Sequence, residues 1–227
     1  MGADAGDAGE RGHDVASDSA ARLDAKKKTV TASERDEERR AAWREQMAGC
    51  DLARLYFVDE CGTHLALSPR YAWAPRGQRA GGQVPRNWGK NTTLVAGLTL
   101  GGLRAPWTIE GAMTTDAFAV YVGEVLAPLL QPGDIVVMDN LSVHKAASIR
   151  QLIAAQGATL VFLPSYSPDF TPVEGAFGKI KTALRRRGAR TRDALLDAIA
   201  QALDTITPQD ALGWFIHAGY RPLLQLS

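Results

Sequence analysis

The chain has 227 residues, of which 45% are hydrophobic and 22% charged, which is typical of a globular protein and excludes a wholly disordered one. No segment approaches the roughly eighteen consecutive apolar residues of a membrane-spanning helix, so we expect no integral membrane protein. Because 26 Lys and Arg residues nearly balance 25 Asp and Glu residues, the net charge of +1 neither favours nor excludes a nucleic-acid partner.

The N-terminal region differs from the rest in composition. Residues 1–24 hold six acidic residues and few large aliphatic ones, so we expect this segment to be disordered. Ser33 and Asp36 resemble a capping box that opens a charged helix over Glu34–Ala48. That helix has few apolar anchors, which indicates a linker or a peripheral helix. The predicted domain organisation is therefore an N-terminal segment, 1–50, and a compact domain, 51–227.

Compartment can be predicted from two further features. The first twenty residues contain no apolar run, so we expect no secretory signal peptide. Cys50 and Cys61 are too few for a disulfide scaffold and are typical of a reducing compartment. We therefore expect a cytoplasmic protein.

Alternating runs of strand-forming and helix-forming residues predict a mixed α/β sheet covered by helices. Gly and Pro separate most of these runs, and Cys61-Gly62 reads as a turn between the first two strands. Phe118, Val122, Val125 and Leu129 are expected to form one buried stripe on the first helix of the domain. The predicted strands are Leu52–Asp59, Thr63–Leu67, Thr92–Leu100, Ile135–Met138 and Thr159–Leu163, and the predicted helices are Thr114–Leu130, Lys145–Gln156, Pro172–Arg187, Arg192–Ile206 and Pro208–Gly219.

Three acidic residues follow buried strands or the loop after the last strand. Asp59 and Asp139 each lie at the carboxyl end of a strand, and Glu174 lies in the first turn of the helix after the loop 164–168. Because ligands of open α/β sheets bind beyond the carboxyl ends of the strands, we expect these three side chains to meet at one edge. Each also has a structural interpretation, as a turn residue for the two aspartates and as part of a capping box from Thr171 for Glu174.

Three carboxylates at one edge would repel one another unless a cation neutralised them. Ligands that are all oxygen favour Mg²⁺ or Mn²⁺. Two such ions about 4 Å apart can hold the attacking and leaving oxygens of a phosphoryl transfer. The pattern therefore predicts a two-ion site for phosphodiester chemistry.

Basic residues follow the third acid. Glu174, Gly178, Lys181 and Arg185 share one helical face, and 179–192 contains seven basic residues and no acidic one. Such a run either complements a helix dipole or binds a phosphate backbone. His144, five residues after Asp139, could contact phosphate or position water, or could be a polar residue at a helix start. The residues expected to contact DNA are Lys90, His144, Lys145, Lys179, Lys181, Arg185, Arg186 and Arg187.

Three segments of the sequence together form a recognisable pattern. They are Val58-Asp59-Glu60, Val137-Met138-Asp139-Asn140 with Val143-His144-Lys145, and 166–174 (YSPDFTPVE) followed by Lys179-Ile180-Lys181. With these segments the sequence resembles the DDE transposases of the mariner-type superfamily, in the bacterial insertion-sequence branch. The resemblance covers roughly 27–220, and thirty-four residues separate Asp139 from Glu174, an interval typical of that superfamily.

The resemblance implies a ribonuclease-H-like fold and metal-dependent cleavage and transfer of DNA strands. It implies that Asp59, Asp139 and Glu174 are the catalytic residues and the ligands of two Mg²⁺ or Mn²⁺ ions, with Asp59 bridging both. The implied partners are double-stranded DNA, as element ends and target, and a second copy of the chain in a homodimer. Such a protein would work at the nucleoid.

Two departures from the family pattern bear on these expectations. Thr171 stands where the family usually has Asn, and either side chain can cap a helix. Complete members carry helix-turn-helix modules ahead of the catalytic domain, whereas residues 1–50 are short and acidic. The sequence therefore indicates a catalytic half whose recognition half is separate, or an inactive or truncated DNA-binding remnant. An unrelated ribonuclease-H-like nuclease without strand transfer is the third hypothesis.

Overall fold

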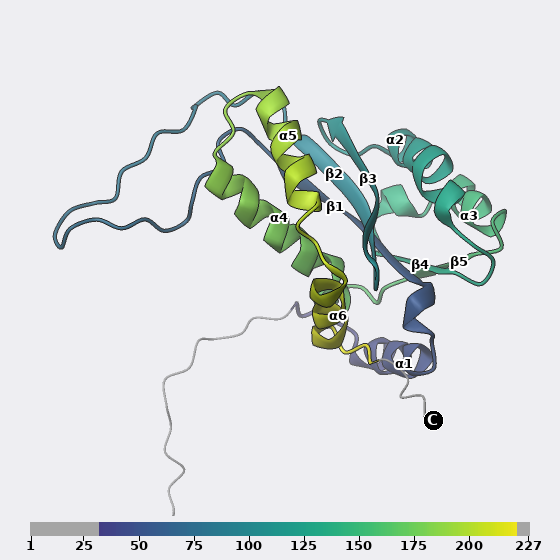
Figure 1. The fold of residues 1–227 in the computed structure, drawn as a ribbon. Coiled ribbons are helices and arrows are strands. Elements are labelled where there is room, and N and C mark those ends of the chain that lie inside the picture. The colour runs from purple at the N-terminus through teal and green to yellow at the C-terminus, as the bar shows by residue number, and fades with distance from the viewer. Residues whose placement is uncertain (1–31, 222–227) are drawn as a thin grey trace, which may run out of the picture. The chain divides into compact units, whose positions relative to one another are not determined.

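A mixed sheet of five strands lies at the centre of residues 32–221, which are the residues that the computed structural model describes (Figure 1). The strand order is β3-β2-β1-β4-β5. β1, β4 and β5 are parallel, whereas β2 and β3 continue the sheet in antiparallel pairs. The strands are β1 (Leu55–Thr63), β2 (Thr92–Thr99), β3 (Gly102–Glu110), β4 (Ile135–Met138) and β5 (Thr159–Phe162). The disorder expected for 1–24 falls outside the described residues and stays a prediction.

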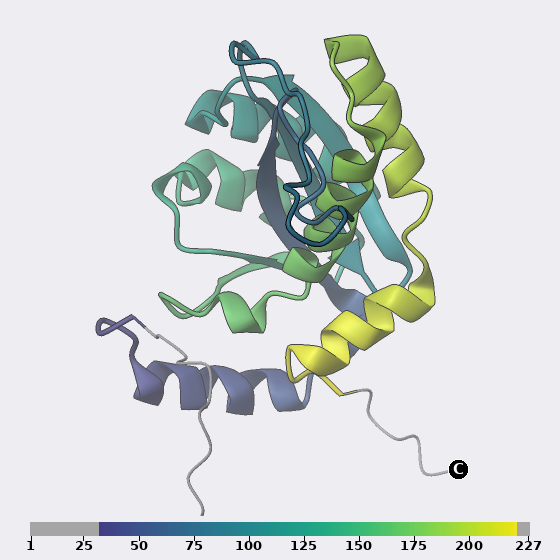
Figure 2. The same cartoon turned by 90° about the vertical axis from the view of Figure 1, so that its left-hand side faces the viewer.

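Helices cover both faces of the sheet. Figures 1 and 2 show α4, α5 and α6 on one side and α2 and α3 on the other. Each side has its own hydrophobic cluster, the first built largely on α4, α5 and α6 and the second on α2 and α3. The helices are α1 (Glu37–Ala48), α2 (Thr115–Tyr121), α3 (Ala147–Ala154), α4 (Val173–Arg187), α5 (Arg192–Leu203) and α6 (Pro208–His217).

Successive residues of β1 supply the two clusters in turn. Phe57 and Cys61 pack in the cluster of α4, whereas Val58 packs in the cluster of α2 and α3. This is the alternation expected of a central strand, whose neighbouring side chains point to opposite faces. Asp59 and Glu60 consequently leave the strand on opposite faces of the sheet.

The first half of the sheet differs from the prediction at two places. The strand expected over Thr63–Leu67 is absent, because β1 continues through Cys61 and Gly62, which pair with Leu94 and Thr93 of β2. β3 was not predicted, and it contains Pro106, a residue that disfavours strands. Pro is tolerated there since β3 is the edge strand and the register shifts between Val95 and Gly97 opposite it, as at a β-bulge.

Two predicted helices are shorter than expected. The segment Thr114–Leu130 is α-helical only as far as Tyr121, and then passes through a π-helical turn and a 3-10 turn. The change of pitch turns Leu129 out of the predicted stripe, so that it is exposed. The helix expected from Lys145 begins at Ala147 and is preceded by a 3-10 turn, Ser142–His144.

Helix α1 joins the core although it was expected to be a linker or peripheral helix. It begins at Glu37 with Asp36 as its N-cap, so the capping box predicted from Ser33 is wrong. Trp43 and Met47 are buried in the cluster of α4. Arg40 is also fully buried. The hydrophobic core therefore includes side chains that precede residue 51.

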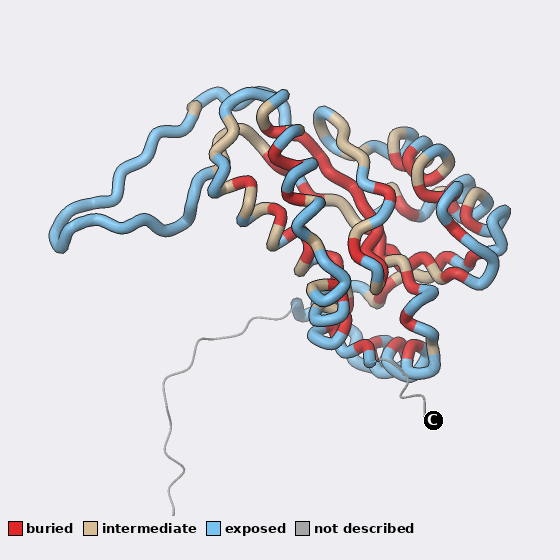
Figure 3. Tube along the Cα trace, in the orientation of Figure 1, coloured by how far each residue is buried: buried red, intermediate tan, exposed pale blue. Residues whose placement is uncertain are grey.

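A long loop, 64–91, connects β1 to β2 and is exposed over most of its length, in contrast to the buried strands (Figure 3). It contains five basic residues and no acidic one. Tyr71 and Trp73 are almost fully exposed in it. None of the helices in 32–221 combines the length and the apolar character needed to cross a membrane.

Candidate active site

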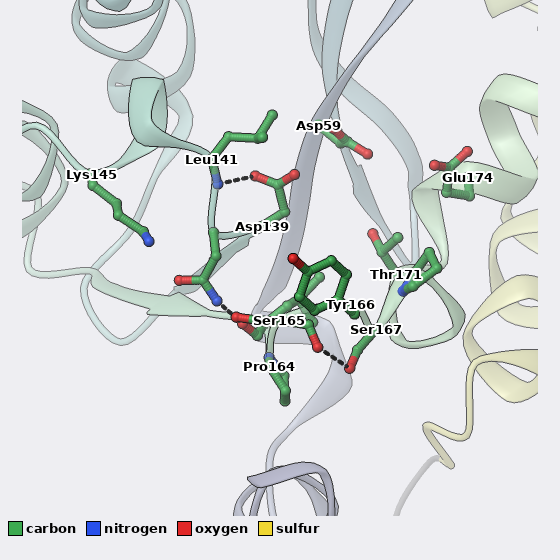
Figure 4. Close-up of a pocket in the computed structure, with 13 residues that line it drawn as sticks. Asp59, Asp139, Leu141, Lys145, Pro164, Ser165, Tyr166, Ser167, Thr171 and Glu174 are labelled. Atoms are coloured by element: carbon green, nitrogen blue, oxygen red, sulfur yellow. Dashed lines mark hydrogen bonds between the residues drawn. The ribbon is translucent and has the colours of Figure 1, made fainter. Parts of the chain in front are cut away.

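A cavity of about 440 Å³ opens at the edge of the sheet where the parallel strands end. Its walls come from β1, the residues after β4, the loop 163–168 and the first turn of α4. Asp59, Asp139 and Glu174 all line it, and Figure 4 shows them facing a common space from three elements. The structure thus brings together the three acids that the sequence singled out.

Strand register places the two aspartates side by side. β1 and β4 are parallel neighbours in which Phe57 pairs with Val137. The same register carried two residues further sets Asp59 level with Asp139. Adjacent parallel strands therefore deliver both carboxylates to one cavity, although Asp59 lies within β1, which continues to Thr63, and not at its carboxyl end as the sequence predicted.

Glu174 reaches the cavity from the second residue of α4. The capping box predicted from Thr171 is wrong, because the N-cap is Pro172 and no side chain caps this helix. Thr171 instead lines the cavity beside Glu174. The Glu174 side chain is exposed, so the structural interpretation of this acid as a capping residue has no contact to support it.

Asp59 lies in an unfavourable environment for a carboxylate. Burial raises its pKa to about 7, and the negative charges of Glu60, Asp139 and Glu174 act in the same direction. The hydrogen bond that its Oδ1 accepts from the backbone N–H of Glu60, at 2.8 Å, only partly opposes this effect. A cation in the cavity would remove the conflict.

Asp139 is stabilised by neighbours that Asp59 lacks. Burial alone would raise the pKa of Asp139, but hydrogen bonds from His144 and from the Leu141 backbone, with the charges of His144 and Lys145, lower it. Burial alone would lower the pKa of His144, whereas its contacts with Asp139 and Glu60 raise it to about 9. The pKa values of the two aspartates are therefore shifted in opposite directions.

His144 cannot contact DNA as the sequence led us to expect. Its side chain is fully buried, and both ring nitrogens are engaged, with Asp139 and with Glu60. The ring also packs on Phe118, at 4.4 Å between centroids. Neither does it begin a helix as an exposed polar residue, the other interpretation that the sequence allowed.

The loop 163–168 forms the lower wall of the cavity and is held by several contacts. The Asn140 side chain donates to the carbonyl of Leu163, and the Ser167 hydroxyl donates to the carbonyl of Ser165 (Figure 4). Tyr166 has a positive φ of 55° and an exposed ring beside the acids. A non-glycine residue in this conformation is held there by its surroundings.

The predicted DNA-contacting residues fall into three groups. Lys145 lines the cavity, and Lys90 lies exposed near β3, paired with Glu110 at 3.7 Å. The Lys179 ammonium is engaged with the Asp210 carboxylate and the Thr205 carbonyl, and its contact with DNA stays a prediction. Among residues 32–221, no acidic partner lies within ion-pair distance of Lys181, Arg185, Arg186 or Arg187.

Lys181 lies on the same side as the acids. Burial raises the pKa of the Cys61 thiol to about 12. The positive charge of Lys181 acts in the opposite direction, whereas the charges of Asp59 and Glu174 add to the rise. Lys181 and Glu174 therefore act on the same thiol, which fits the shared helical face predicted from their spacing.

Sequence reasoning missed the roles of Glu60, Asn140 and Tyr166 at this edge. Glu60 was noted only as part of a motif, because its neighbour Asp59 was the acid expected at the strand end. The strand alternation that sends Asp59 to one face sends Glu60 to the other, where His144 lies, and this signal was available in the sequence.

The donor set suits a hard divalent cation, because it offers carboxylate oxygens, backbone carbonyls and hydroxyls. Within residues 32–221, no three His, Cys, Asp or Glu side chains converge closely enough to hold one ion. A pair of ions bridged by Asp59 needs only two of these carboxylates for each ion. The residues present therefore fit the group that the sequence implies.

Comparison with known proteins shows the family and the fold. The sequence model of a family described as DDE superfamily endonuclease matches residues 54–196. No curated protein matches the chain at a significant level.

Solved structures of Mos1 transposase are among those that match. The pre-cleavage Mos1 transpososome aligns with a TM-score of 0.71 at 16% identity over 88% of this chain, which spans 64% of that chain. The catalytic domain of Mos1 mariner transposase aligns with a TM-score of 0.60 at 13% identity, over 80% of this chain and 85% of that one. The Mos1 catalytic domain with Raltegravir and Mg aligns with a TM-score of 0.61 at 15% identity, over 83% and 92%. The mixed five-stranded sheet flanked by helices is thus a ribonuclease-H-like fold, as the sequence predicted.

Proposed function

The chain belongs to the DDE superfamily endonucleases, and from this premise we propose that it is the catalytic domain of a DNA transposase. The observation that carries the proposal is the convergence of Asp59, Asp139 and Glu174 on one cavity. These three residues are proposed as the catalytic residues and the ligands of two Mg²⁺ or Mn²⁺ ions. The match of the sequence motifs supports the bacterial insertion-sequence branch.

In the proposed reaction, water attacks a phosphodiester bond and frees a 3′ hydroxyl. That hydroxyl then attacks a phosphodiester of the target DNA, which joins the strand end to the target and releases the target's own 3′ hydroxyl. Bound divalent ions would supply charge neutralisation and activation of the attacking oxygen. Asp59, whose pKa is raised mainly by burial, would hold the ions together with Asp139 and Glu174. Lys145, at the cavity wall, would bind a phosphate of the cleaved strand.

The DNA backbone is proposed to run along two basic surfaces. One is the C-terminal half of α4 with Lys181, Arg185, Arg186 and Arg187, which have no acidic partner among the described residues. The other is the loop 64–91 with Lys90 at its end, where exposed aromatic side chains lie among basic ones. A homodimer, an upstream helix-turn-helix half and the domain limits 1–50 and 51–227 are proposed on the sequence resemblance alone.

Cleavage and joining can be tested separately. The purified chain would be incubated with DNA carrying candidate element ends, with Mg²⁺ or Mn²⁺, and with any recognition half encoded beside it. We expect metal-dependent nicking and joined products from the parent and neither from Glu174→Gln. Nicking without joining would indicate a nuclease of the same fold, and binding without either would indicate an inactive remnant. Equal nicking by Glu174→Gln would refute the assignment.

A further inference from the structure

The buried side chain of His144 contacts two acidic residues, Asp139 after β4 and Glu60 on β1. His144 Nδ1 lies 2.7 Å from Asp139 Oδ1, and His144 Nε2 lies 3.1 Å from Glu60 Oε2. The imidazole is fully buried, and Phe118 packs against its ring. Glu60 is itself mostly buried, with a side chain 17% exposed. Two carboxylates are thus joined through one ring that solvent does not reach.

The bridge connects elements that are far apart in sequence. Glu60 leaves β1 on the face opposite to Asp59, and 84 positions separate it from His144. The 3-10 turn Ser142–His144 folds the histidine back onto Asp139, five positions earlier. The bridge therefore fixes the segment after β4 against β1 at the edge where the cavity opens.

Only one of the two carboxylate oxygens of Asp139 has hydrogen-bond partners among the described residues. Oδ1 accepts from the Leu141 backbone N–H at 2.9 Å and also contacts His144. Within residues 32–221, Oδ2 has no such partner, and Figure 4 shows it on the side of the cavity where Asp59 lies. A carboxylate held by one oxygen has one fixed orientation, which leaves the other oxygen available as a ligand.

We propose that His144, braced by Glu60, is a positioning residue that orients Asp139 so that Oδ2 faces the ion site. The proposal rests on the proposed function, because it concerns the same cavity. Without the bridge, the Asp139 side chain regains rotational freedom, and Glu60 loses its only side-chain partner in 32–221. Groups that orient a metal ligand in this way affect metal affinity by about 10- to 100-fold.

Three variants separate positioning from simple stability. His144→Phe keeps a ring against Phe118 but removes both hydrogen bonds. The double variant His144→Phe/Glu60→Leu also removes the unpaired acid, and replacement of a buried polar pair by apolar groups is often neutral for stability. Glu60→Gln is the conservative control, because its amide oxygen still accepts from the imidazole.

The measurements are Mn²⁺ affinity by calorimetric titration, melting temperature in EDTA, and kcat and KM for DNA cleavage. We expect His144→Phe and the double variant to bind Mn²⁺ about 10- to 100-fold more weakly. The double variant should melt close to the parent in EDTA, and Glu60→Gln should bind Mn²⁺ within about threefold of the parent, since the hydrogen bond remains. kcat should fall in the first two variants while KM for DNA holds.

Parental Mn²⁺ affinity in the double variant would overturn the proposal, as would a rise in KM for DNA with kcat unchanged. If His144→Phe does not fold, the double variant alone decides. Asp59→Asn distinguishes the two levels of inference. If it abolishes Mn²⁺ binding while the His144 variants bind normally, only the positioning role fails. If the parent binds no Mn²⁺, or Asp59→Asn binds it equally well, the proposed function fails and the positioning role fails with it.

Discussion

At the scale of single residues, the fold places the Asp59 carboxyl where its ionised form is disfavoured. It is half-buried, three acids lie near it, and its pKa is raised to about 7, mainly by burial. Asp139, its neighbour on the next strand, has a lowered pKa because His144 and the Leu141 N–H stabilise its charge. A carboxylate kept in such an environment costs stability, which is typical of a site that serves a ligand.

Asp59→Asn should leave stability in EDTA unchanged or raise it, and more at pH 8 than at pH 5. A raised carboxyl pKa means that the folded state holds the proton more tightly than the unfolded state. The cost to stability therefore grows as pH rises above the ordinary value near 4 and is complete above about 7. The amide removes this cost. Thermal melts of parent and variant at both pH values measure it.

Asp197→Asn is a matched control, because Asp197 is exposed on α5 and makes no salt bridge among the described residues. The melting temperature of this variant should stay close to that of the parent. If Asp59→Asn instead melts lower at both pH values, Asp59 is a hydrogen-bonded structural residue.

At the scale of elements, the position of α4 depends on a close approach to α6. A Cβ added at Gly175 would lie 2.4 Å from the Trp214 ring, closer than packed atoms can be. Gly175 follows Glu174 directly, so this contact sets how the first turn of α4 enters the cavity. Gly178, one turn later, has no atom within 4 Å of such a Cβ.

Gly175→Ala should therefore destabilise the protein by about 1–3 kcal/mol, as overpacking does. Gly178→Ala, the control, should stabilise it by about 0.5–1 kcal/mol, because Ala has the higher helix propensity. Urea denaturation measures both free energies of unfolding. Equal effects of the two substitutions would show that α4 and α6 adjust freely around Trp214.

An ion pair joins helix α1 to the loop after β5, and one of its partners is buried whereas the other is half exposed. Arg40 is buried, donates to both oxygens of Asp169 at 3.0 and 2.6 Å, and lies 4.0 Å from the centre of the Phe170 ring. Asp169 is half exposed. Tyr220 adds a hydrogen bond to the Phe170 carbonyl and receives one from Trp43.

Asp169→Ala should destabilise the protein more than Arg40→Met. Loss of Asp169 leaves a buried guanidinium with Glu37 alone, at 3.5 Å, and unpaired buried charge costs about 3–5 kcal/mol. Loss of Arg40 leaves a carboxylate that water can reach, and Met fills part of the space, so we expect about 1–2 kcal/mol. The two free energies of unfolding in urea test this order, and the reverse order would contradict it.

At the scale of the whole molecule, net charge conceals the charge distribution. The chain carries +1 overall, yet acids gather at the cavity and basic residues on α4 and in the loop 64–91. A polyanion can therefore approach a nearly neutral protein along specific faces.

Lys181→Ala/Arg185→Ala should weaken DNA binding for all sequences alike. If each residue contacts one phosphate, the slope of log affinity against log salt should decrease in magnitude by about 1.8, at about 0.9 for each phosphate. Lys179→Ala is the control on the same helix, because Asp210 already holds its ammonium. It should change stability but leave the slope unchanged. Fluorescence anisotropy over a range of salt concentrations measures the slope, and a parental slope in the double variant would exclude this role.

The sequence by itself determined the features that arise from local pattern. Runs of apolar residues identified β1, β2, β4 and β5. Asp59 and Asp139, the acids after the predicted first and fourth strands, both line the cavity, although β1 extends past Asp59 to Thr63. Helical spacing after a Pro-rich loop located Glu174 and the basic face of α4. Such patterns are readable because burial of one face repeats with the period of the element.

Only the tertiary structure decided what depends on partners distant in the chain. Pairing with β2 extends β1 through Gly62, and pairing of β2 with β3 places Pro106 in an edge strand. His144 lies 84 positions from Glu60 in the sequence, and Asp169 lies 129 positions from Arg40. Because of these contacts, His144, which was predicted to contact DNA, is buried between Asp139 and Glu60. Helix α1, which was predicted to be a linker or peripheral helix, is part of the core. No local pattern encodes them, because the energy of a buried polar pair depends on which side chains the fold brings together.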